Sequence, residues 1–158
     1  MKYKLVDNGQ INKTIIKVVG VGGCGGNAID HMVSNGVEGV ETISANTDSQ
    51  ALLKNKATEK IILGELNNHG QGAGGKPDVG RDTALDDYER LTTMFEGANM
   101  VFIAAGMGGG TGTGAAPIVA RAAKEVGALS VAIVTKPMSL EFKDDLAGFF
   151  ELISHREK

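Results

Sequence analysis

The sequence predicts a doubly wound α/β domain, with a mainly parallel sheet and helices on both faces. Short runs rich in β-branched residues, typical of strands buried on both faces, alternate along the chain with segments whose apolar residues recur every three to four positions. Strands that alternate with helices pair in parallel through right-handed crossovers. The length of 158 residues suits one domain with a sizeable core.

Five strands are expected, because five apolar runs are bounded by glycine or polar residues. They are residues 15–21, 40–46, 59–63, 100–105 and 128–135. In an open sheet of this class, ligands bind beyond the carboxyl ends of the strands, near the point where the strand order reverses. Any ligand site is therefore expected at that edge.

Four helices are expected between these strands, and the last two follow the 3.6-residue period most clearly. They are residues 27–34, 49–53, 81–96 and 113–126. Residues 64–80 hold seven glycine or proline positions and no apolar period, which predicts a long loop. A loop of this length in a compact domain is usually functional or mobile.

Charge and cysteine content exclude several classes of protein. Sixteen basic and 19 acidic residues give a net charge of −3, and no basic stripe is present, so we expect no nucleic-acid partner. The single cysteine, Cys24, excludes an internal disulfide framework and fits a reducing compartment. No apolar run approaches the roughly 18 residues of a membrane span, and residues 1–10 lack the apolar core of a signal peptide. A cytoplasmic protein without direct membrane insertion is expected.

The 23 glycines are concentrated rather than spread along the chain. Fifteen of them lie in residues 20–26, 70–75 and 106–114. The first and third windows each follow an expected strand and precede an expected helix, where glycine lets backbone amides approach a phosphate closely. Two such loops at one edge of a sheet indicate a nucleotide.

The first two windows are ambiguous when taken alone. Residues 20–25 satisfy G-x-G-x-x-G, and Asp48 follows the next strand, so a dinucleotide-binding fold and an oxidoreductase activity remain an alternative. Residues 70–76 resemble the start of a Walker A loop, but Pro77 stands where that motif needs Ser or Thr. We therefore exclude a P-loop kinase or ATPase and expect Pro77 to mark a turn.

The third window is the most specific. It has six glycines in nine residues, with Thr111 and Thr113 between them and Pro117 in the helix that follows. GGGTGTG after MVFIAAGM resembles the signature of the tubulin-like GTPases, within them the FtsZ family of bacterial cell-division proteins. The resemblance extends over IKVVGVGGCGGNAI, NTDSQAL, GQGAGGKPDVGR and GALSVAIVTKP. It implies a GTP-binding domain at residues 14–142, a flexible extension at 1–13, and a divergent, partly helical segment at 143–158.

The resemblance also implies the nucleotide-binding residues, which come from five segments. They are Gly23, Cys24, Gly25, Gly26 and Asn27 under the phosphates; Asn46 and Thr47, with Asp48, beside the nucleotide; Ala73, Gly74, Gly75 and Lys76 near the γ-phosphate; Gly108, Gly109, Gly110, Thr111, Gly112 and Thr113 around the phosphates; and Thr135, Pro137 and Glu141 near the ribose. Cys24 and Lys76 depart from the glycine and asparagine that are usual there. Asp145 stands about where the family has an arginine near the nucleotide.

The function implied by the resemblance is GTP or GDP binding, with Mg²⁺, in septum formation by a GTP-dependent polymer. In this family hydrolysis occurs between subunits, and the synergy loop and second domain that complete it have no counterpart in this sequence. We therefore expect no catalytic residue in this chain and little or no turnover by the chain alone. The expected partners are full-length FtsZ-like subunits, joined head to tail at the division site.

Two further hypotheses follow for a chain with only one of the two assembly surfaces. It could cap or modulate filaments of a full-length partner, because heterologous assembly needs both faces. Alternatively, it is a truncated gene product or an expressed fragment with no role of its own. The family segments without a counterpart here would leave an apolar edge and face of the sheet exposed, and the helically spaced Phe149, Phe150, Leu152 and Ile153 are the candidates to cover part of it.

Overall fold

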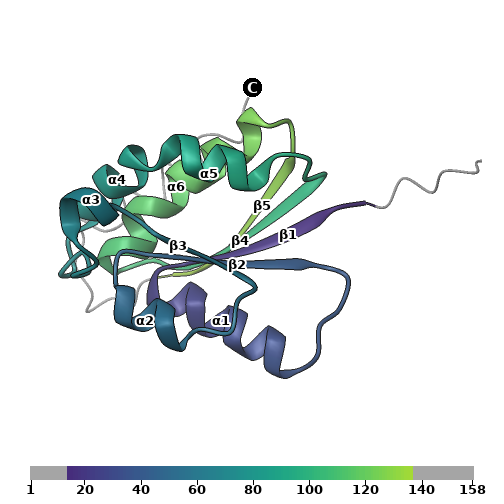
Figure 1. The fold of residues 1–158 in the computed structure, drawn as a ribbon, viewed down its shortest axis with the longest axis horizontal. Coiled ribbons are helices and arrows are strands. Elements are labelled where there is room, and N and C mark those ends of the chain that lie inside the picture. The colour runs from purple at the N-terminus through teal and green to yellow at the C-terminus, as the bar shows by residue number, and fades with distance from the viewer. Residues whose placement is uncertain (1–13, 137–158) are drawn as a thin grey trace, which may run out of the picture.

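The computed structural model describes residues 14–136 and confirms the doubly wound fold. Its sheet has five parallel strands in the order β3-β2-β1-β4-β5 (Figure 1). The strands are β1 (Ile16–Val21), β2 (Glu41–Asn46), β3 (Glu59–Ile62), β4 (Met100–Gly106) and β5 (Leu129–Thr135). The order reverses between β1 and β4, which places the switch point there.

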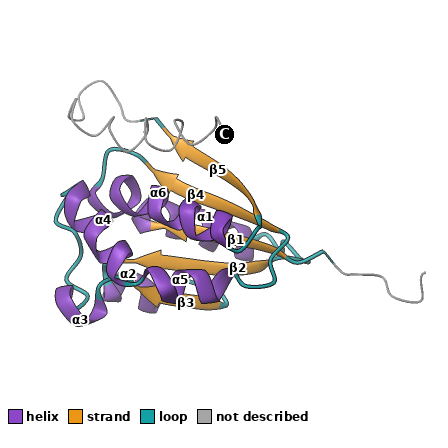
Figure 2. Cartoon of the chain, turned by 90° about the horizontal axis from the view of Figure 1, so that it is seen from above, coloured by secondary structure: helices purple, strands orange, loops and turns teal. Residues whose placement is uncertain are grey.

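Helices cover both faces of the sheet (Figures 1 and 2). On one face lie α1 (Gly22–Ser34) and α2 (Ser49–Lys54), and on the other α4 (Pro77–Asp86), α5 (Tyr88–Phe95) and α6 (Gly110–Glu125). A single-turn helix, α3 (Glu65–Asn68), follows β3. None of the helices within residues 14–136 is long and apolar enough to cross a membrane.

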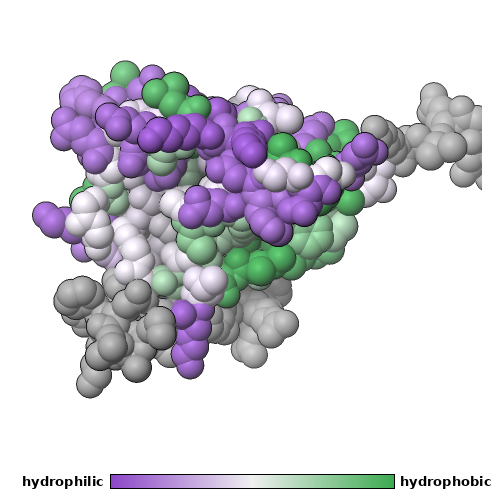
Figure 3. All heavy atoms as spheres, turned by 90° about the horizontal axis from the view of Figure 1, so that it is seen from below, coloured by the Kyte–Doolittle hydropathy of each residue, from purple (hydrophilic) through white to green (hydrophobic). Residues whose placement is uncertain are grey.

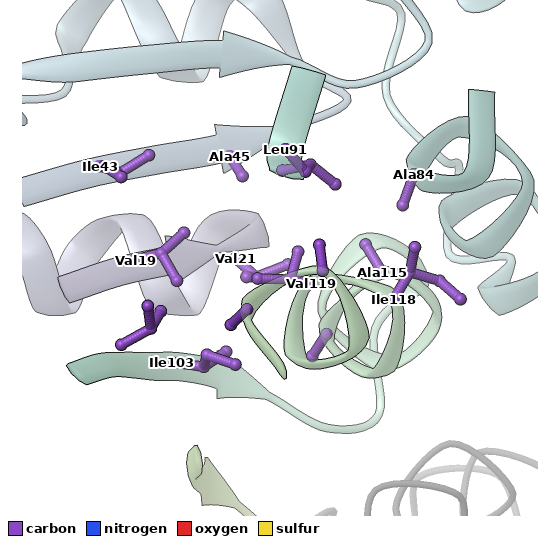
Figure 4. Packing of buried hydrophobic residues seen from close by; sticks show 14 of the residues in the cluster. Val19, Val21, Ile43, Ala45, Ala84, Leu91, Ile103, Ala115, Ile118 and Val119 are labelled. Carbon is purple, nitrogen blue, oxygen red and sulfur yellow. The ribbon is translucent and has the colours of Figure 1, made fainter. Parts of the chain in front are cut away.

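The main core lies between the sheet and the second helical layer. Alternate residues of β1 and β4 point into it because side chains alternate between the two faces of a strand. Figure 4 shows Val19, Val21 and Ile103 on the side of Val119 of α6, and Ala115 and Ile118 of the same helix on the side of Ala84 of α4. The buried face of α6 is rich in alanine and glycine, which brings this helix close to the sheet. A smaller cluster, with Val18 and Ile29, lies under α1.

The glycine-rich helix starts differ from the sequence prediction. α1 begins at Gly22 rather than Asn27, and α6 begins at Gly110 rather than Thr113. Glycine carries no side chain, so these first turns have no apolar period to reveal them. The helical residues therefore reach into the two glycine windows themselves.

The region from 64 to 96 also needs correction. The predicted loop contains α3 and the start of α4, and Pro77 is the first residue of α4 rather than a turn. Proline fits this position because its fixed φ is helical and its missing N–H would have no helical partner.

The predicted helix 81–96 is two helices, α4 and α5, with a break at Asp87. The buried Asp87 carboxylate accepts hydrogen bonds from Gly64 N–H (2.6 Å) and Arg90 Nη1 (2.7 Å). Asp87 therefore connects the break between α4 and α5 to Gly64, which lies two residues after the end of β3.

A polar cluster joins α5 to α6 on the surface away from the strand ends. The Tyr88 hydroxyl donates to Glu125 Oε2 at 2.6 Å, and the Arg121 guanidinium lies 4.8 Å from the centre of the tyrosine ring. Burial raises the pKa of Tyr88, and the hydrogen bond to Glu125 raises it further. The phenol therefore stays protonated and keeps this link between the helices over the physiological pH range.

Candidate nucleotide-binding site

A hollow of about 520 Å³ opens at the carboxyl ends of β1, β4 and β5. This volume is within the range of sites for small molecules and cofactors. Its lining consists of Val21, Gly23, Cys24, Gly106, Met107, Gly108, Gly109, Gly110, Thr111, Gly112, Thr135 and Lys136. The hollow thus lies at the switch point of the sheet, where a doubly wound fold binds its ligand.

Two helix N-termini meet at this hollow, from opposite faces of the sheet. The residues before the two helices, Val21 for α1 and Gly109 for α6, make no side-chain cap hydrogen bond. Neither helix has an acidic residue in its first turn. Uncapped N-termini present free N–H donors and a partial positive charge, so both favour a bound anion.

Some glycines of the two windows are required by close packing. A Cβ on Gly25 would overlap the Ala104 carbonyl oxygen and would lie 2.7 Å from the Gly20 carbonyl carbon. A Cβ on Gly112 would overlap the Gly106 carbonyl oxygen. These glycines allow α1 and α6 to approach β1 and β4 closely, so the fold itself requires them.

Other glycines face open space. A Cβ on Gly23 or on Gly109 would meet no atom within 4 Å, and both residues are exposed and line the hollow. Their conformations, with no positive φ, do not demand glycine. The absence of a side chain at these two positions keeps the first turns of both helices accessible, which is what a phosphate needs.

Two threonine hydroxyls of the third window position the loop. Thr111 Oγ1 is hydrogen-bonded to Thr47 Oγ1 at 2.7 Å, and both residues are buried. Thr113 Oγ1 accepts a hydrogen bond from Gly108 N–H at 2.9 Å. The first bond fixes the start of α6 to the end of β2, and the second shapes the turn before α6.

The second glycine window is held beside the first turn of α6. Gly72 N–H donates to the Thr47 carbonyl oxygen (2.9 Å), and Ser49 N–H donates to the Gly70 carbonyl oxygen (3.1 Å). A Cβ on Gly110 would lie 2.8 Å from Ala73 Cβ and from Lys76 N, so the loop touches α6. Gly74, Gly75 and Lys76 are exposed there. The second glycine window therefore lies beside the third, at the start of α6.

Asp48 has a structural role in this arrangement. Its side chain caps α2, with Oδ1 accepting hydrogen bonds from Gln50 N–H (2.9 Å) and Ala51 N–H (3.2 Å). The residue also forms an isolated antiparallel bridge with Gln71. The Asp48 carboxylate, which suggested a ribose contact in a dinucleotide site, therefore serves as the N-cap of α2.

The predicted site residues fall into three groups. Those that line the hollow are Gly23, Cys24, Gly108, Gly109, Gly110, Thr111, Gly112 and Thr135. Those outside the lining are Gly25, Gly26, Asn27, Asn46, Thr47, Ala73, Gly74, Gly75, Lys76 and Thr113. Gly26 faces the α2 side, where its carbonyl oxygen accepts from Asn55 Nδ2 at 2.9 Å. Pro137 and Glu141 lie outside the described residues.

The sequence prediction missed Lys136, the one charged side chain in the described lining. A signal for it existed, since a lysine directly after the last strand must lie at the carboxyl edge of the sheet. With Lys136 the hollow combines amide donors, hydroxyls, a thiol and an ammonium group, and its described lining has no carboxylate. This donor set is suited to an anionic ligand.

Comparison with known proteins assigns the family. The family model described as "Tubulin/FtsZ family, GTPase domain" matches residues 15–147, which is most of the chain. This chain belongs to the tubulin/FtsZ family. Within that family it is 58% identical over 140 residues to a cell division protein FtsZ of Pseudomonas aeruginosa and 53% identical over 148 residues to one of Buchnera aphidicola.

These FtsZ proteins are much longer than this chain. The two matches cover 88% and 91% of this chain but 35% and 38% of the respective relatives. A solved structure described as an empty FtsZ dimer of M. jannaschii superposes with a TM-score of 0.87 at 43% identity, covering 92% of this chain and 44% of that one. The chain therefore corresponds to the part of an FtsZ protein that contains the GTPase-domain match.

Proposed function

We propose that this chain binds GTP and GDP in the hollow between α1 and α6, as the nucleotide-binding part of an FtsZ-type cell-division GTPase. The observation that carries the proposal is the meeting of two uncapped helix N-termini at one hollow of about 520 Å³. Membership of the tubulin/FtsZ family supplies the guanine preference, which the phosphate-binding loops by themselves do not determine.

The proposed binding mode follows from the donors that the hollow offers. The first turns of α1 and α6 would donate backbone N–H groups to the phosphates, because both turns are open at Gly23 and Gly109. Lys136, and Lys76 from the neighbouring loop, would add positive charge. Thr135 lies at the β5 side of the hollow, and with Pro137 and Glu141 it is proposed to face the ribose.

Mg²⁺ is proposed to accompany the nucleotide rather than to occupy a site made by the protein alone. Residues 14–136 contain no group of three His, Cys, Asp or Glu side chains that could hold a metal ion. Mg²⁺ commonly keeps several waters and binds through substrate phosphates with few protein ligands.

Hydrolysis is proposed to need a second subunit. The described lining has no carboxylate to orient a water molecule, and Gly23, Cys24, Gly109 and Lys136 are exposed at the edge of the sheet, where another subunit can reach a bound nucleotide. We propose that this partner is an FtsZ-like subunit joined head to tail in the cytoplasm at the division site. Capping of such a filament, by binding through this surface, is the alternative role.

Equilibrium binding distinguishes this function from the dinucleotide alternative. Fluorescent GTP would be titrated into the purified chain and then displaced with unlabelled GTP, GDP, ATP and NAD. GTP and GDP are expected to displace the probe at similar concentrations, and ATP and NAD at least tenfold less effectively. Equal displacement by NAD would favour a dinucleotide site, and no saturable binding of GTP would refute the proposal.

A further inference from the structure

A buried carboxylate outside the hollow, that of Asp87, has no part in the binding mode described above. The residue is 7% exposed. One carboxylate oxygen accepts a hydrogen bond from Gly64 N–H at 2.6 Å, and the other accepts one from Arg90 Nη1 at 2.7 Å. Arg90 Nη1 also lies 3.7 Å from Glu65 Oε2, so both partners of Asp87 lead to the start of α3. Buried charges need such partners, because an unpaired one is strongly disfavoured.

Burial limits what Asp87 can contact. Figure 3 views the molecule from the α1 side of the sheet, where hydrophilic residues cover much of the upper part and a hydrophobic area lies along the lower edge. Asp87 lies on the opposite side, at the break between α4 and α5, and Gly64 is buried beside it. The carboxylate therefore acts on the rest of the molecule through Gly64 and Arg90.

Gly64 connects Asp87 to the whole of α3. It is the N-cap of this helix and has a φ of +68°, in the left-handed region that favours glycine. Its carbonyl oxygen accepts hydrogen bonds from Asn67 N–H (3.1 Å) and Asn68 N–H (2.7 Å). A Cβ at Gly64 would overlap Thr83 Cγ2 of α4. The start of α3 is therefore packed against α4 as well as bonded to the residue that ends it.

Helix α3 in turn holds the second glycine window. Asn68 Nδ2 donates a hydrogen bond to the Gly72 carbonyl oxygen at 3.0 Å. The other end of the window continues directly into α4 at Pro77. Residues 73–76 are therefore suspended between Gly72 and Pro77, and both of these points lead back to Asp87, one through α3 and the other through α4.

The bond between Gly64 and Asp87 thus closes residues 64–87 into a ring that contains the second window. Closure of this kind restricts a segment in advance, so less freedom is lost when a ligand binds to it. Residues 73–76 lie outside the described lining of the hollow, but they touch Gly110 in the first turn of α6. A ligand reaches them only with a group that extends beyond the lining, such as an additional phosphate.

We propose that Asp87 is a positioning residue that sets the preference of the site for GTP over GDP. It holds residues 73–76, with the exposed Lys76, in place for the terminal phosphate, whereas the phosphates common to both nucleotides lie at α1 and α6. Without Asp87 the ligand itself would have to order the window, and that cost would fall on the triphosphate alone. This inference rests on the proposed function, because it takes the nucleotide to lie in the hollow.

Asp87→Asn tests the proposal with little change in shape. The amide has one acceptor oxygen instead of two, so either Gly64 N–H or Arg90 loses its partner. Calorimetric titration with GTP and with GDP gives the two dissociation constants. The value for GTP should rise at least fivefold, and that for GDP less than twofold, because only the triphosphate depends on the window.

Tyr88→Phe is the matched control. It removes a hydrogen bond from the neighbouring residue, to Glu125 at the far end of α6, and it leaves α3 and the second window untouched. It should lower stability without changing the ratio of the two dissociation constants. Asn68→Ala is a second test variant, because it removes the side-chain bond to Gly72 at a half-buried position, and it should lower the preference for GTP as Asp87→Asn does.

Hydrogen exchange of the apo chain adds a measurement that needs no nucleotide. Amides of residues 72–76 should exchange faster in Asp87→Asn than in the parent, and at the parent rate in Tyr88→Phe. An unchanged window or an unchanged ratio in Asp87→Asn would overturn the inference, and Asn68→Ala decides if Asp87→Asn does not fold. Equal losses of GTP and GDP affinity would also overturn it. Each of these results leaves the proposed function intact, whereas a parent chain that binds neither nucleotide would refute both.

Discussion

Glycines near the proposed nucleotide site have two different structural roles: some permit close packing, and others leave helix amides accessible. Gly25 and Gly112 permit backbone contacts that a Cβ would block, whereas Gly23 and Gly109 leave open space in front of helix amides. Sequence alone identified the windows, because glycine clusters between strands and helices indicate close approach to a phosphate. The sequence did not distinguish the two roles, because the atoms that crowd Gly25 belong to β1 and β4 rather than to its own helix.

Alanine substitutions at Gly25 and Gly23 of α1 should distinguish the two roles by their effects on stability. Gly25→Ala should lower the free energy of unfolding by about 1–3 kcal/mol or more, because the new methyl group overlaps backbone atoms that cannot move independently. Gly23→Ala should be neutral or stabilising by up to about 1 kcal/mol, because alanine favours helix and nothing lies near the added Cβ. Urea denaturation of both variants measures the difference, and equal destabilisation would contradict the assignment.

A charge at Gly109 should weaken nucleotide binding without harming the fold. Gly109 is the N-cap of α6 in an extended conformation that aspartate also adopts, so Gly109→Asp should keep or slightly raise stability, by a few tenths of a kcal/mol. Its carboxylate would cap the free N–H groups and repel the phosphates, since two like charges 4 Å apart repel by about 4 kcal/mol at an effective dielectric constant of about 20.

Affinity for GDP, measured by calorimetry, should fall at least tenfold in Gly109→Asp. Gly109→Asn is the matched control, because it has nearly the same shape and capping ability without the charge, and it should lose less affinity. If both variants bind as tightly as the parent, the phosphates do not lie at the α6 N-terminus.

At the scale of elements, the hydroxyl pair Thr47–Thr111 connects the end of β2 to the first turn of α6. Residues 64 positions apart meet through it, in a place where both side chains are buried. Gly72 N–H also bonds to the Thr47 carbonyl, so the same point holds the second glycine window. Thr47 therefore contacts both the start of α6 and the second glycine window. Its own segment and these two are three of the five that the resemblance places around one nucleotide.

A double-mutant cycle should measure this connection. Thr111→Val keeps the shape but leaves the buried Thr47 hydroxyl without its partner, which should cost about 1–3 kcal/mol of stability. Thr47→Val should behave similarly, and the double variant should cost less than the sum of the two. Urea denaturation of the apo chain gives all four values. Simple additivity would show that the hydroxyls do not interact in solution.

The elements that could be predicted from the sequence are those with side chains to form a pattern. All five strands were located to within a residue or two at each end, since their β-branched runs are buried on both faces. The starts of α1 and α6 were missed because glycine has no side chain to contribute to the apolar periodicity of a helix. The break at Asp87 was missed because its carboxylate is held by Gly64 N–H, 23 residues away, and no local sequence pattern reports such a contact.

At the scale of the whole molecule, the strand order puts the proposed site at an exposed edge. The chain leaves β1 toward one face of the sheet and leaves β4 toward the other, and the hollow between these two exits opens to the outside. A ligand there would be held from one side by this chain and would remain accessible to another protein from the other side. This geometry supports the proposal that hydrolysis is completed by a second subunit.

Turnover should therefore depend on a partner. The chain alone should bind GTP but release phosphate at least a hundredfold more slowly than a full-length FtsZ at the same concentration. Substoichiometric amounts of the chain, added to the full-length protein, should reduce its assembly as measured by light scattering. Rapid turnover by the chain alone would refute the subunit-completion proposal, and unchanged assembly would argue against capping.

The most direct measurement of the central claim is a titration of the ¹⁵N-labelled chain with GDP, followed by nuclear magnetic resonance of the backbone amides. The account predicts the largest shift changes in two separate segments, residues 22–24 and 108–112, which form the first turns of α1 and α6 and the turn before α6. Amides near Tyr88 should remain unchanged. Shift changes confined to one of the two segments, or centred elsewhere in the molecule, would contradict the claim that both helix N-termini hold the phosphates.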